Sequence, residues 1–246
     1  RSWENHNLAT LERLRQLDEH PEGERPYLIV SLGDSSVQGM GASRVTESYP
    51  ARLASAITQQ MDREVLLLNL SLSGATIESV ELTQLPQMRG LGLLDGPYRP
   101  DLVTLTIGGN DVMAEDMAPG QFEERLRRIL AALPSGALVS TIPSFGIMPQ
   151  ESRAQDMSDR IRAAVEDSDA HLVDLRSLTQ EYSLPTYTFA YHAADFFHPN
   201  SAAYAKWAQL FADAWAESRR EPAPVVEDAP QWDMLSARVA QSEYDD

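Results

Sequence analysis

The chain has 246 residues, of which 23% are charged and 43% hydrophobic, a balance typical of a single large globular domain. Its formal net charge of −17 argues against binding to nucleic acid or to anionic membrane surfaces, which attract basic proteins. It contains no cysteine, so disulfides, thiolate catalysis and cysteine-based metal sites are excluded.

The first part of the chain, residues 1–24, is predicted to be an N-terminal helical segment. Four leucines recur at every third position, which is typical of a helix with one apolar row: Leu8, Leu11, Leu14 and Leu17. Pro21 and Gly23 then end the helix.

No apolar run in the chain approaches the roughly 20 residues that a membrane-spanning helix needs. No signal peptide is evident either. Because the chain begins at Arg1 rather than with methionine, two expectations stay open. The protein is either cytoplasmic, or exported or anchored through a preceding segment.

The main domain is predicted to span residues 25–220. Five short apolar runs predict buried strands at residues 27–32, 65–70, 102–107, 137–142 and 171–173. Amphipathic patterns between and after them predict helices at 48–61, at 76–85, from 119 to about 133, at 154–166, and from 200 onward. This alternation predicts a mainly parallel five-stranded α/β sheet covered on both faces.

Two segments near the C-terminus depart from this alternation. The stretch after residue 174 is predicted to be irregular. Residues 221–246 hold three prolines and seven acidic residues against one basic residue, which predicts an extended or weakly ordered tail. A short helix at residues 232–240 stays open.

Four polar segments lie next to predicted elements, where a parallel sheet would bring them to one edge. Ser35 follows the first strand, Gly74 the second and Asn110 the third, while Asp195 and His198 directly precede the last helix. Each segment alone is typical of an ordinary turn or helix entry. Together they supply the residue types that serine acyl transfer needs.

In that chemistry a serine hydroxyl becomes a nucleophile only when a neighbouring base takes its proton. His198 is the candidate base, because imidazole titrates closest to neutrality. Asp195 can fix the tautomer of the imidazole and stabilise its protonated form. Backbone N–H groups at Ser35 and Gly74 and the carboxamide of Asn110 are candidate donors to an oxyanion.

These blocks resemble the SGNH hydrolases, also called the GDSL family. The resemblance rests on Gly33-Asp34-Ser35, the Gly74 loop, Gly108-Gly109-Asn110-Asp111 and Asp195-x-x-His198-Pro199, in that order. It implies a three-layer α/β/α sandwich of flavodoxin-like type and hydrolysis of esters or thioesters. It also implies that Ser35 is the nucleophile, that Gly74 and Asn110 complete the oxyanion hole, and that Asp195 and His198 complete the triad. Ser36 stands where the family has leucine.

The leading hypothesis is therefore a metal-independent serine esterase that acts on small acyl esters without a cofactor. A carbohydrate O-deacetylase or an acyltransferase with the same triad is the alternative, and a non-catalytic binding module is the third. Six apolar side chains line an acyl pocket or, equally, belong to ordinary core packing: Val37, Met40, Met113, Phe145, Phe196 and Phe197. The oligomeric state is left open.

Overall fold

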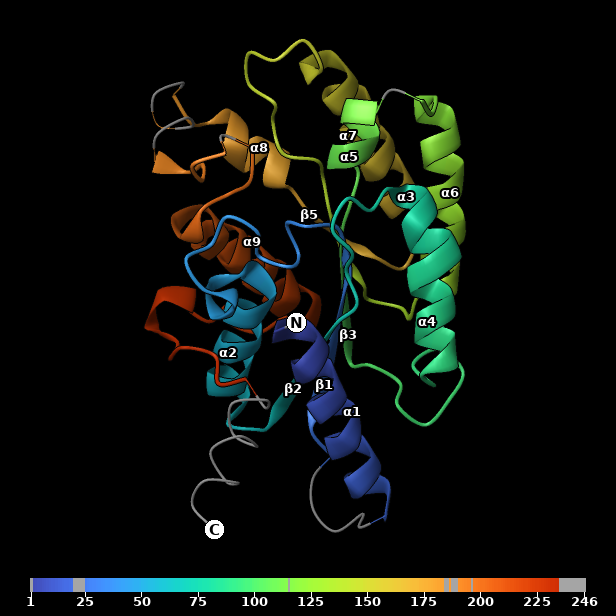
Figure 1. Cartoon of the computed structure of the whole chain (residues 1–246), viewed down its shortest axis with the longest axis vertical. Helices are drawn as coiled ribbons and strands as arrows, with labels where there is room; N and C mark the ends of the chain where they lie inside the picture. Colours follow the sequence, from blue (N-terminus) through green and yellow to red (C-terminus); the bar gives the residue numbers. More distant parts are fainter. Residues whose placement is uncertain are drawn as a thin grey trace.

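A computed structural model describes residues 2–19, 25–114, 116–183, 186, 190–195 and 197–234. Within them lies one five-stranded sheet in the order β2-β1-β3-β4-β5, and every neighbouring pair of strands is parallel (Figure 1). The strands are β1 Tyr27–Gly33, β2 Val65–Asn69, β3 Leu102–Thr106, β4 Leu138–Ser140 and β5 His171–Val173. The predicted parallel α/β sheet is confirmed.

Helices cover both faces of this sheet, as the alternation of strands and helices predicts (Figure 1). One face carries α2 Tyr49–Met61 and α9 Ser201–Arg219. The other carries α3 Ile77–Ser79, α4 Leu85–Gly90, α6 Pro119–Ala132 and α7 Glu151–Glu166. The shorter elements are η1 Val45–Glu47, η2 Val80–Gln84, α5 Gly109–Ala114, α8 Leu175–Gln180 and η4 Val226–Asp228.

Alternate residues of β1 separate the two cores. Leu28, Val30 and Leu32 point toward the α6–α7 face, whereas Tyr27 and Ile29 point toward α2 and α9. All of them are buried, because a parallel strand with helices on both sides has no exposed face. The sheet is therefore a rigid base for the loops at its carboxyl edge.

Polar side chains of the first helix, α1 Ser2–Glu19, form hydrogen bonds with β2, which is an edge strand of the sheet. Its Asn7 carboxamide donates to the Asn69 carbonyl at 2.7 Å and accepts from the Asn69 amide at 3.0 Å. His6 and Thr10 are buried and contact the Leu67 carbonyl. The predicted helix is confirmed, but its leucine row is only partly buried, because Leu14 lies in the core and Leu11 packs against it whereas Leu8 is 63% exposed.

Three other expectations need correction or extension. Among its described residues, the segment after Asp174 is irregular only beyond residue 180, because α8 Leu175–Gln180 begins there with Asp174 accepting a hydrogen bond from the Ser177 amide. The predicted helix at 76–85 continues to Gly90 through the π-helical η2. Helix α7 begins at Glu151, three residues before the predicted start.

The described part of the predicted tail, residues 221–234, packs on the domain. Val226 is buried, and Ser55 Oγ on α2 donates to the Pro230 carbonyl. Residues 235–246, and with them most of the helix left open at 232–240, lie outside the described residues. In the part of the chain that is described, no helix has both the length and the apolar character needed to cross a bilayer.

Candidate active site

Strand β1 ends in a tight loop that presents Ser35 at the carboxyl edge of the sheet. Gly33 has φ +139°, and a Cβ there would lie 2.0 Å from the Thr106 carbonyl oxygen, so only glycine fits. The buried Gln84 side chain accepts from the Gly33 amide at 2.9 Å and donates to the Gly33 carbonyl at 2.7 Å. These two bonds fix the backbone directly before the serine.

The loop after Gly33 is built around the buried carboxylate of Asp34. Asp34 accepts hydrogen bonds from the Ser36 amide at 2.9 Å and the Ser36 hydroxyl at 2.7 Å. Burial raises the pKa of Asp34, and the bonds from Ser36 oppose that shift. The serine that replaces the family's leucine therefore supports the turn, while Ser35 itself is only 6% exposed.

Three predicted site residues form one hydrogen-bonded chain. Ser35 Oγ lies 2.9 Å from His198 Nε2, and His198 Nδ1 lies 2.6 Å from Asp195 Oδ2. Because Asp195 accepts a hydrogen bond from Nδ1–H, Nδ1 carries the ring proton, and Nε2 is the ring nitrogen able to accept the serine proton. The hydroxyl and the imidazole are thus arranged for proton transfer.

Hydrogen bonds stabilise the ionised form of Asp195. Partial desolvation works against ionisation, but bonds from the His198 ring and from the Phe197 and His198 amides outweigh it. Together they lower the pKa of Asp195 to about 2. The carboxylate is therefore ionised at neutral pH and can stabilise a protonated imidazole.

Asp195 and His198 lie in a narrow turn of residues 191–200. The Ala193 amide donates to the His198 carbonyl at 2.9 Å, and the Asn200 amide donates to the Tyr191 carbonyl at 3.0 Å. Asn200 also caps α9 by accepting from the amides of Ala202 and Ala203. The histidine is thereby held at the start of a long, buried helix.

The turn and the Ser35 loop are joined by direct contacts. The Tyr204 hydroxyl on α9 donates to the Met40 carbonyl at 2.7 Å, and Ser201 Oγ accepts from the Ser43 amide at 2.9 Å. Gly41 lets the two segments touch, since a Cβ there would lie 2.4 Å from the Pro199 carbonyl oxygen. These contacts set the spacing between Ser35 and His198.

Of the predicted oxyanion residues, Ser35 and Asn110 line the pocket, and Gly74 lies beside it without being part of the lining. Asn110 Nδ2 donates to the Ala75 carbonyl at 2.8 Å, which joins the start of α5 to the Gly74 loop. A carboxamide nitrogen carries two hydrogens, so one stays available to a ligand. Among the described residues, the amides of Ser35 and Gly74 have no hydrogen-bond acceptor. Three candidate donors therefore lie at this edge.

A buried carboxylate strengthens the same junction. Both oxygens of Asp111 accept from the Ile77 amide at 3.1 Å, at the start of α3. Burial raises the pKa of Asp111 to about 6, with the hydrogen bond from Ile77 opposing the shift. Asp111 thus has a structural role beside Asn110, as its position in the sequence block indicates.

A pocket of about 250 Å³ opens beside Ser35 and His198. We call its reactive side, formed by Asp34, Ser35, Ser36, Asn110 and His198, the serine side. The opposite side, formed by the loop after β4, is called the loop side: Pro143, Ser144, Phe145, Ile147 and Met148. Both sides reach the same opening.

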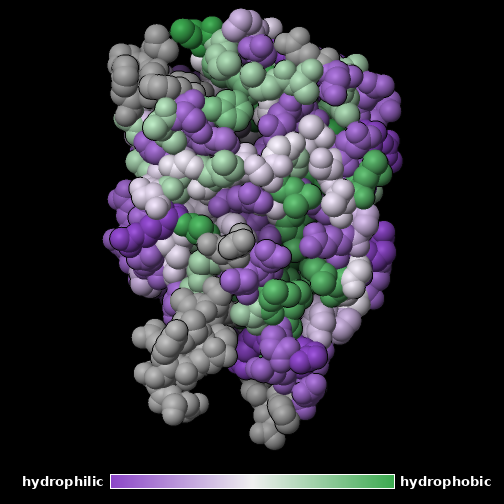
Figure 2. Space-filling view, in the orientation of Figure 1, coloured by the Kyte–Doolittle hydropathy of each residue, from purple (hydrophilic) through white to green (hydrophobic). Residues whose placement is uncertain are grey.

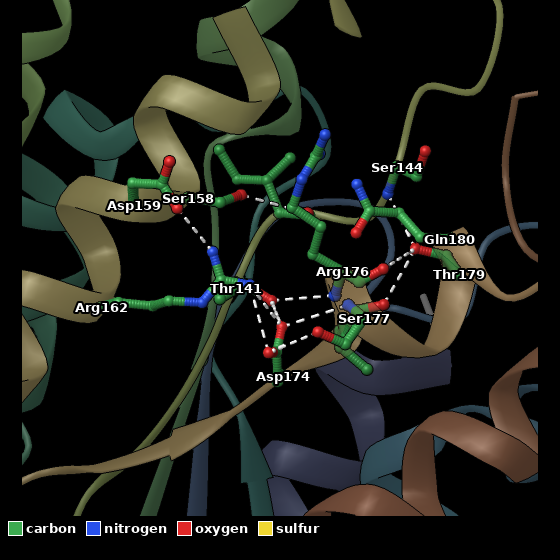
Figure 3. A network of polar contacts seen from close by, with 12 residues as sticks. Thr141, Ser144, Ser158, Asp159, Arg162, Asp174, Arg176, Ser177, Thr179 and Gln180 are labelled. Atoms are coloured by element: carbon green, nitrogen blue, oxygen red, sulfur yellow. Dashed lines mark hydrogen bonds and ion pairs between the residues drawn. The ribbon is translucent and has the colours of Figure 1, made fainter. Parts of the chain in front are cut away.

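The loop side is held by α7 and α8, and Figure 3 shows the bond between Ser144 and Thr179 of α8. The Ser144 amide donates to Thr179 Oγ1 at 2.8 Å, and the Phe145 amide donates to Glu151 at 2.6 Å. The fully buried guanidinium of Arg176 forms an ion pair with the same Glu151. A buried pair of this kind fixes the loop, because either partner alone would be an uncompensated charge.

The six residues predicted to line an acyl pocket have different positions. Phe145 and Phe197 line the pocket. Val37 does not, because it is fully buried in the core between the sheet and α2. Met40 and Met113 are partly exposed at the carboxyl edge but are not part of the lining. Phe196 lies outside the described residues.

Several lining residues had no signal in the sequence. Tyr182, Tyr191 and His192 reach the pocket from the segment before the histidine turn. Trp207 also lines it, although its helical stripe indicates only core packing. Gln84, which holds Gly33 without lining the pocket, also belongs to no motif. Among the described residues, no three histidine or carboxylate side chains gather as metal ligands.

A parallel sheet with a serine, a histidine and these donors at its carboxyl edge is the arrangement of a hydrolase. The model of the GDSL-like lipase/acylhydrolase family matches residues 31–206, and the chain belongs to this family. None of the curated protein sequences compared with the chain matches it.

Solved structures show the same fold. A lipase/acylhydrolase from Enterococcus faecalis is 20% identical, with TM-score 0.62, covering 78% of this chain and 96% of that one. An alpha/beta hydrolase enzyme from the metagenome of Lake Arreo is 23% identical, with TM-score 0.60 and coverages of 77% and 95%. An acetylxylan esterase from Geobacillus stearothermophilus is 18% identical, with TM-score 0.58 and coverages of 77% and 94%.

Proposed function

We propose that this chain is a serine esterase that hydrolyses carboxylic (acyl) esters or thioesters through an acyl-serine intermediate. The observation that carries the proposal is the hydrogen-bonded chain from Asp195 through His198 to Ser35, with distances of 2.6 Å and 2.9 Å. This chain of groups opens into a pocket with apolar side chains from the loop side. The proposed chemistry uses only these side chains and water.

In the first half-reaction, Ser35 Oγ attacks the ester carbonyl while its proton passes to His198 Nε2. The developing oxyanion accepts hydrogen bonds from the Ser35 and Gly74 amides and the Asn110 carboxamide. Collapse of the tetrahedral intermediate breaks the bond to the alcohol, which takes the proton from Nε2. Asp195 stays ionised throughout, as its lowered pKa allows.

In the second half-reaction, water takes the place of the alcohol. His198 Nε2 accepts one of its protons, and the resulting hydroxide attacks the acyl carbonyl. The bond between the acyl group and Ser35 Oγ then breaks, and the serine regains the proton from the imidazole. The net products are a carboxylic acid and an alcohol.

The test is covalent labelling by a fluorophosphonate combined with turnover of p-nitrophenyl acetate. Ser35→Ala should lose the label and lower kcat by about 10⁴-fold or more. Ser36→Ala is the matched control and should keep the label, because its hydroxyl donates to Asp34 instead of the histidine. Labelling of Ser35→Ala, or turnover by it at the original rate, would overturn the proposal.

A carbohydrate O-deacetylase is the second candidate, favoured by the polar groups in the pocket. Ser144, Thr179, Tyr182 and His192 line it, and among the described residues the buried Tyr182 hydroxyl has no hydrogen-bond partner. Such groups suit a hydroxylated alcohol portion of the substrate. Rates on acetyl through palmitoyl esters, measured beside acetylated xylan, distinguish the two candidates. Only the deacetylase prefers the acetylated xylan.

A further inference from the structure

The large apolar side chains that remain exposed are concentrated at one edge of the molecule. Nine such residues occur in the described part of the chain, and six of them lie in the segments that follow β1 to β4 or directly precede α9. We call these six the apolar rim: Met40, Leu72, Met113, Ile147, Met148 and Phe197. The other three, Leu8, Leu82 and Val225, lie elsewhere in the fold.

Four residues of the rim follow four different strands, so the rim extends along the carboxyl edge of the sheet. Leu72 follows β2, Met40 follows β1, Met113 follows β3 in α5, and Ile147 follows β4, which is the order of the strands in the sheet. Figure 2 shows green and pale green side chains among polar ones at the upper end of the molecule, where Figure 1 places α5 and α8.

Contacts tie the rim to the pocket opening. Ile147, Met148 and Phe197 line the pocket themselves. Met40 contacts Ser73 on the Gly74 loop, with 3.4 Å between its sulfur and the serine hydroxyl. Half of the rim therefore belongs to the pocket and the other half lies along the same edge of the sheet, with Ile147 81% exposed.

Single exposed apolar residues are ordinary on protein surfaces, but a group of them at one edge, half of it lining a pocket, marks a contact surface. Protein-binding hot spots are enriched in tryptophan, tyrosine and arginine, and the rim has none of these. It holds three methionines, whose flexible side chains adapt to an irregular or fluid surface. The net charge of −17 disfavours an anionic surface.

We propose that the apolar rim adsorbs to the uncharged surface of aggregated lipid, so that acyl esters enter the pocket directly from that phase. Adsorption brings the opening against the lipid and removes the rim from water. The role of the rim in turnover rests on the proposed esterase function. Adsorption itself does not, and it can be measured on a protein without the nucleophile.

The experiment uses flotation of the Ser35→Ala protein with triolein droplets coated with phosphatidylcholine. The protein should float with the droplets, and adding Met113→Glu with Ile147→Glu should lower the bound fraction by at least about tenfold. The matched control is Leu82→Glu with Val225→Glu, which adds the same charge at sites that are 62% and 55% exposed. It should bind within about twofold of the parent protein.

Circular dichroism and thermal unfolding establish that both double variants are folded. Failure of the parent to float, or equal loss by the rim and control variants, would overturn the proposal. A parent dimer that Met113→Glu with Ile147→Glu converts to a monomer would also overturn it, because a second copy would then cover the rim. If the wild-type protein hydrolyses dissolved esters but the parent protein does not float with the droplets, the esterase proposal stands and the adsorption proposal is overturned.

Discussion

The two sides of the pocket are held in place in different ways. On the serine side the reactive groups themselves form the hydrogen bonds, as between Ser35 and His198 and between Asn110 and Ala75. On the loop side the bonds go to the backbone instead, where Glu151 and Thr179 accept from the amides of Phe145 and Ser144. The side chains that face the pocket there are mainly apolar.

This difference follows from what each side has to do. A proton transfer or an oxyanion contact depends on the distance between particular atoms, so each atom needs its own fixed partner. Apolar contact with an acyl chain depends on buried area and tolerates many side chains. We therefore expect substitutions on the serine side to change rate constants, and substitutions on the loop side to change the preference for acyl length.

The largest effect is expected from removing the charge that supports His198. Asp195→Asn should lower kcat by about 10³- to 10⁴-fold, because a carboxamide can orient the wrong tautomer and cannot balance the imidazolium. Stopped-flow or steady-state rates on p-nitrophenyl acetate measure this loss. Asp228→Asn in η4 is the control, since Asp228 is an exposed carboxylate far along the chain. A loss below about tenfold would contradict the assigned role.

A smaller loss is expected from one oxyanion donor. Asn110→Ala should lower kcat by about 10²- to 10³-fold, equivalent to about 2.7–4 kcal/mol, with KM changed much less. Asn110→Asp keeps the shape but replaces the donor with an acceptor, so its kcat should fall at least as far. Since Asn110 also bonds Ala75, urea unfolding should accompany the kinetics. An unchanged kcat with lowered stability would make Asn110 purely structural.

The same distinction explains what the sequence could predict. The serine side depends on short local blocks at strand ends, where chemistry restricts the residue type, so Ser35, Asn110 and His198 are recognisable without coordinates. Tyr182 and His192 also line the pocket, although they belong to none of these blocks. Their position depends on tertiary packing, which a local pattern does not encode.

Two features that hydrophobic periodicity does not predict have a related cause. Hydrophobic periodicity assumes that buried faces are apolar, yet α1 buries His6 and Thr10 because they bond the free edge of β2. Helix α8 was missed for the same reason, since its buried Arg176 has the appearance of a surface residue. In both places polar groups are buried because they satisfy specific partners, which periodicity does not register.

The buried carboxylate beside the oxyanion donors gives a test of the fixed geometry on the serine side. With the pKa of Asp111 raised to about 6 from 3.8, the folded state keeps its proton while the unfolded state loses it. Stability should therefore fall as pH rises from about 4 through 6, by at most about 3 kcal/mol relative to Asp111→Asn. Asparagine does not titrate and still accepts from the Ile77 amide.

Urea unfolding of both proteins between pH 4 and 7.5 measures this difference. Contributions common to both proteins cancel, including that of Asp195, whose lowered pKa acts in the opposite direction at more acidic pH. Parallel stability curves would mean that Asp111 is ionised in the folded state across this range, and that burial at the junction with α3 is weaker than described.

The smallest effect, and the most direct comparison of the two sides, comes from two phenylalanines. Phe145 lies on the loop side, whereas Phe197 packs edge-on against the His198 ring with 5.1 Å between centroids. Phe145→Ala should lower kcat/KM for an octanoyl ester about tenfold relative to an acetyl ester, because it removes apolar contact. Phe197→Ala should lower the rates on both esters by a similar factor, because the His198 ring loses a packing contact that orients it. If both variants changed the same ratio, the two sides would not be separable, and acyl recognition would extend onto the serine side.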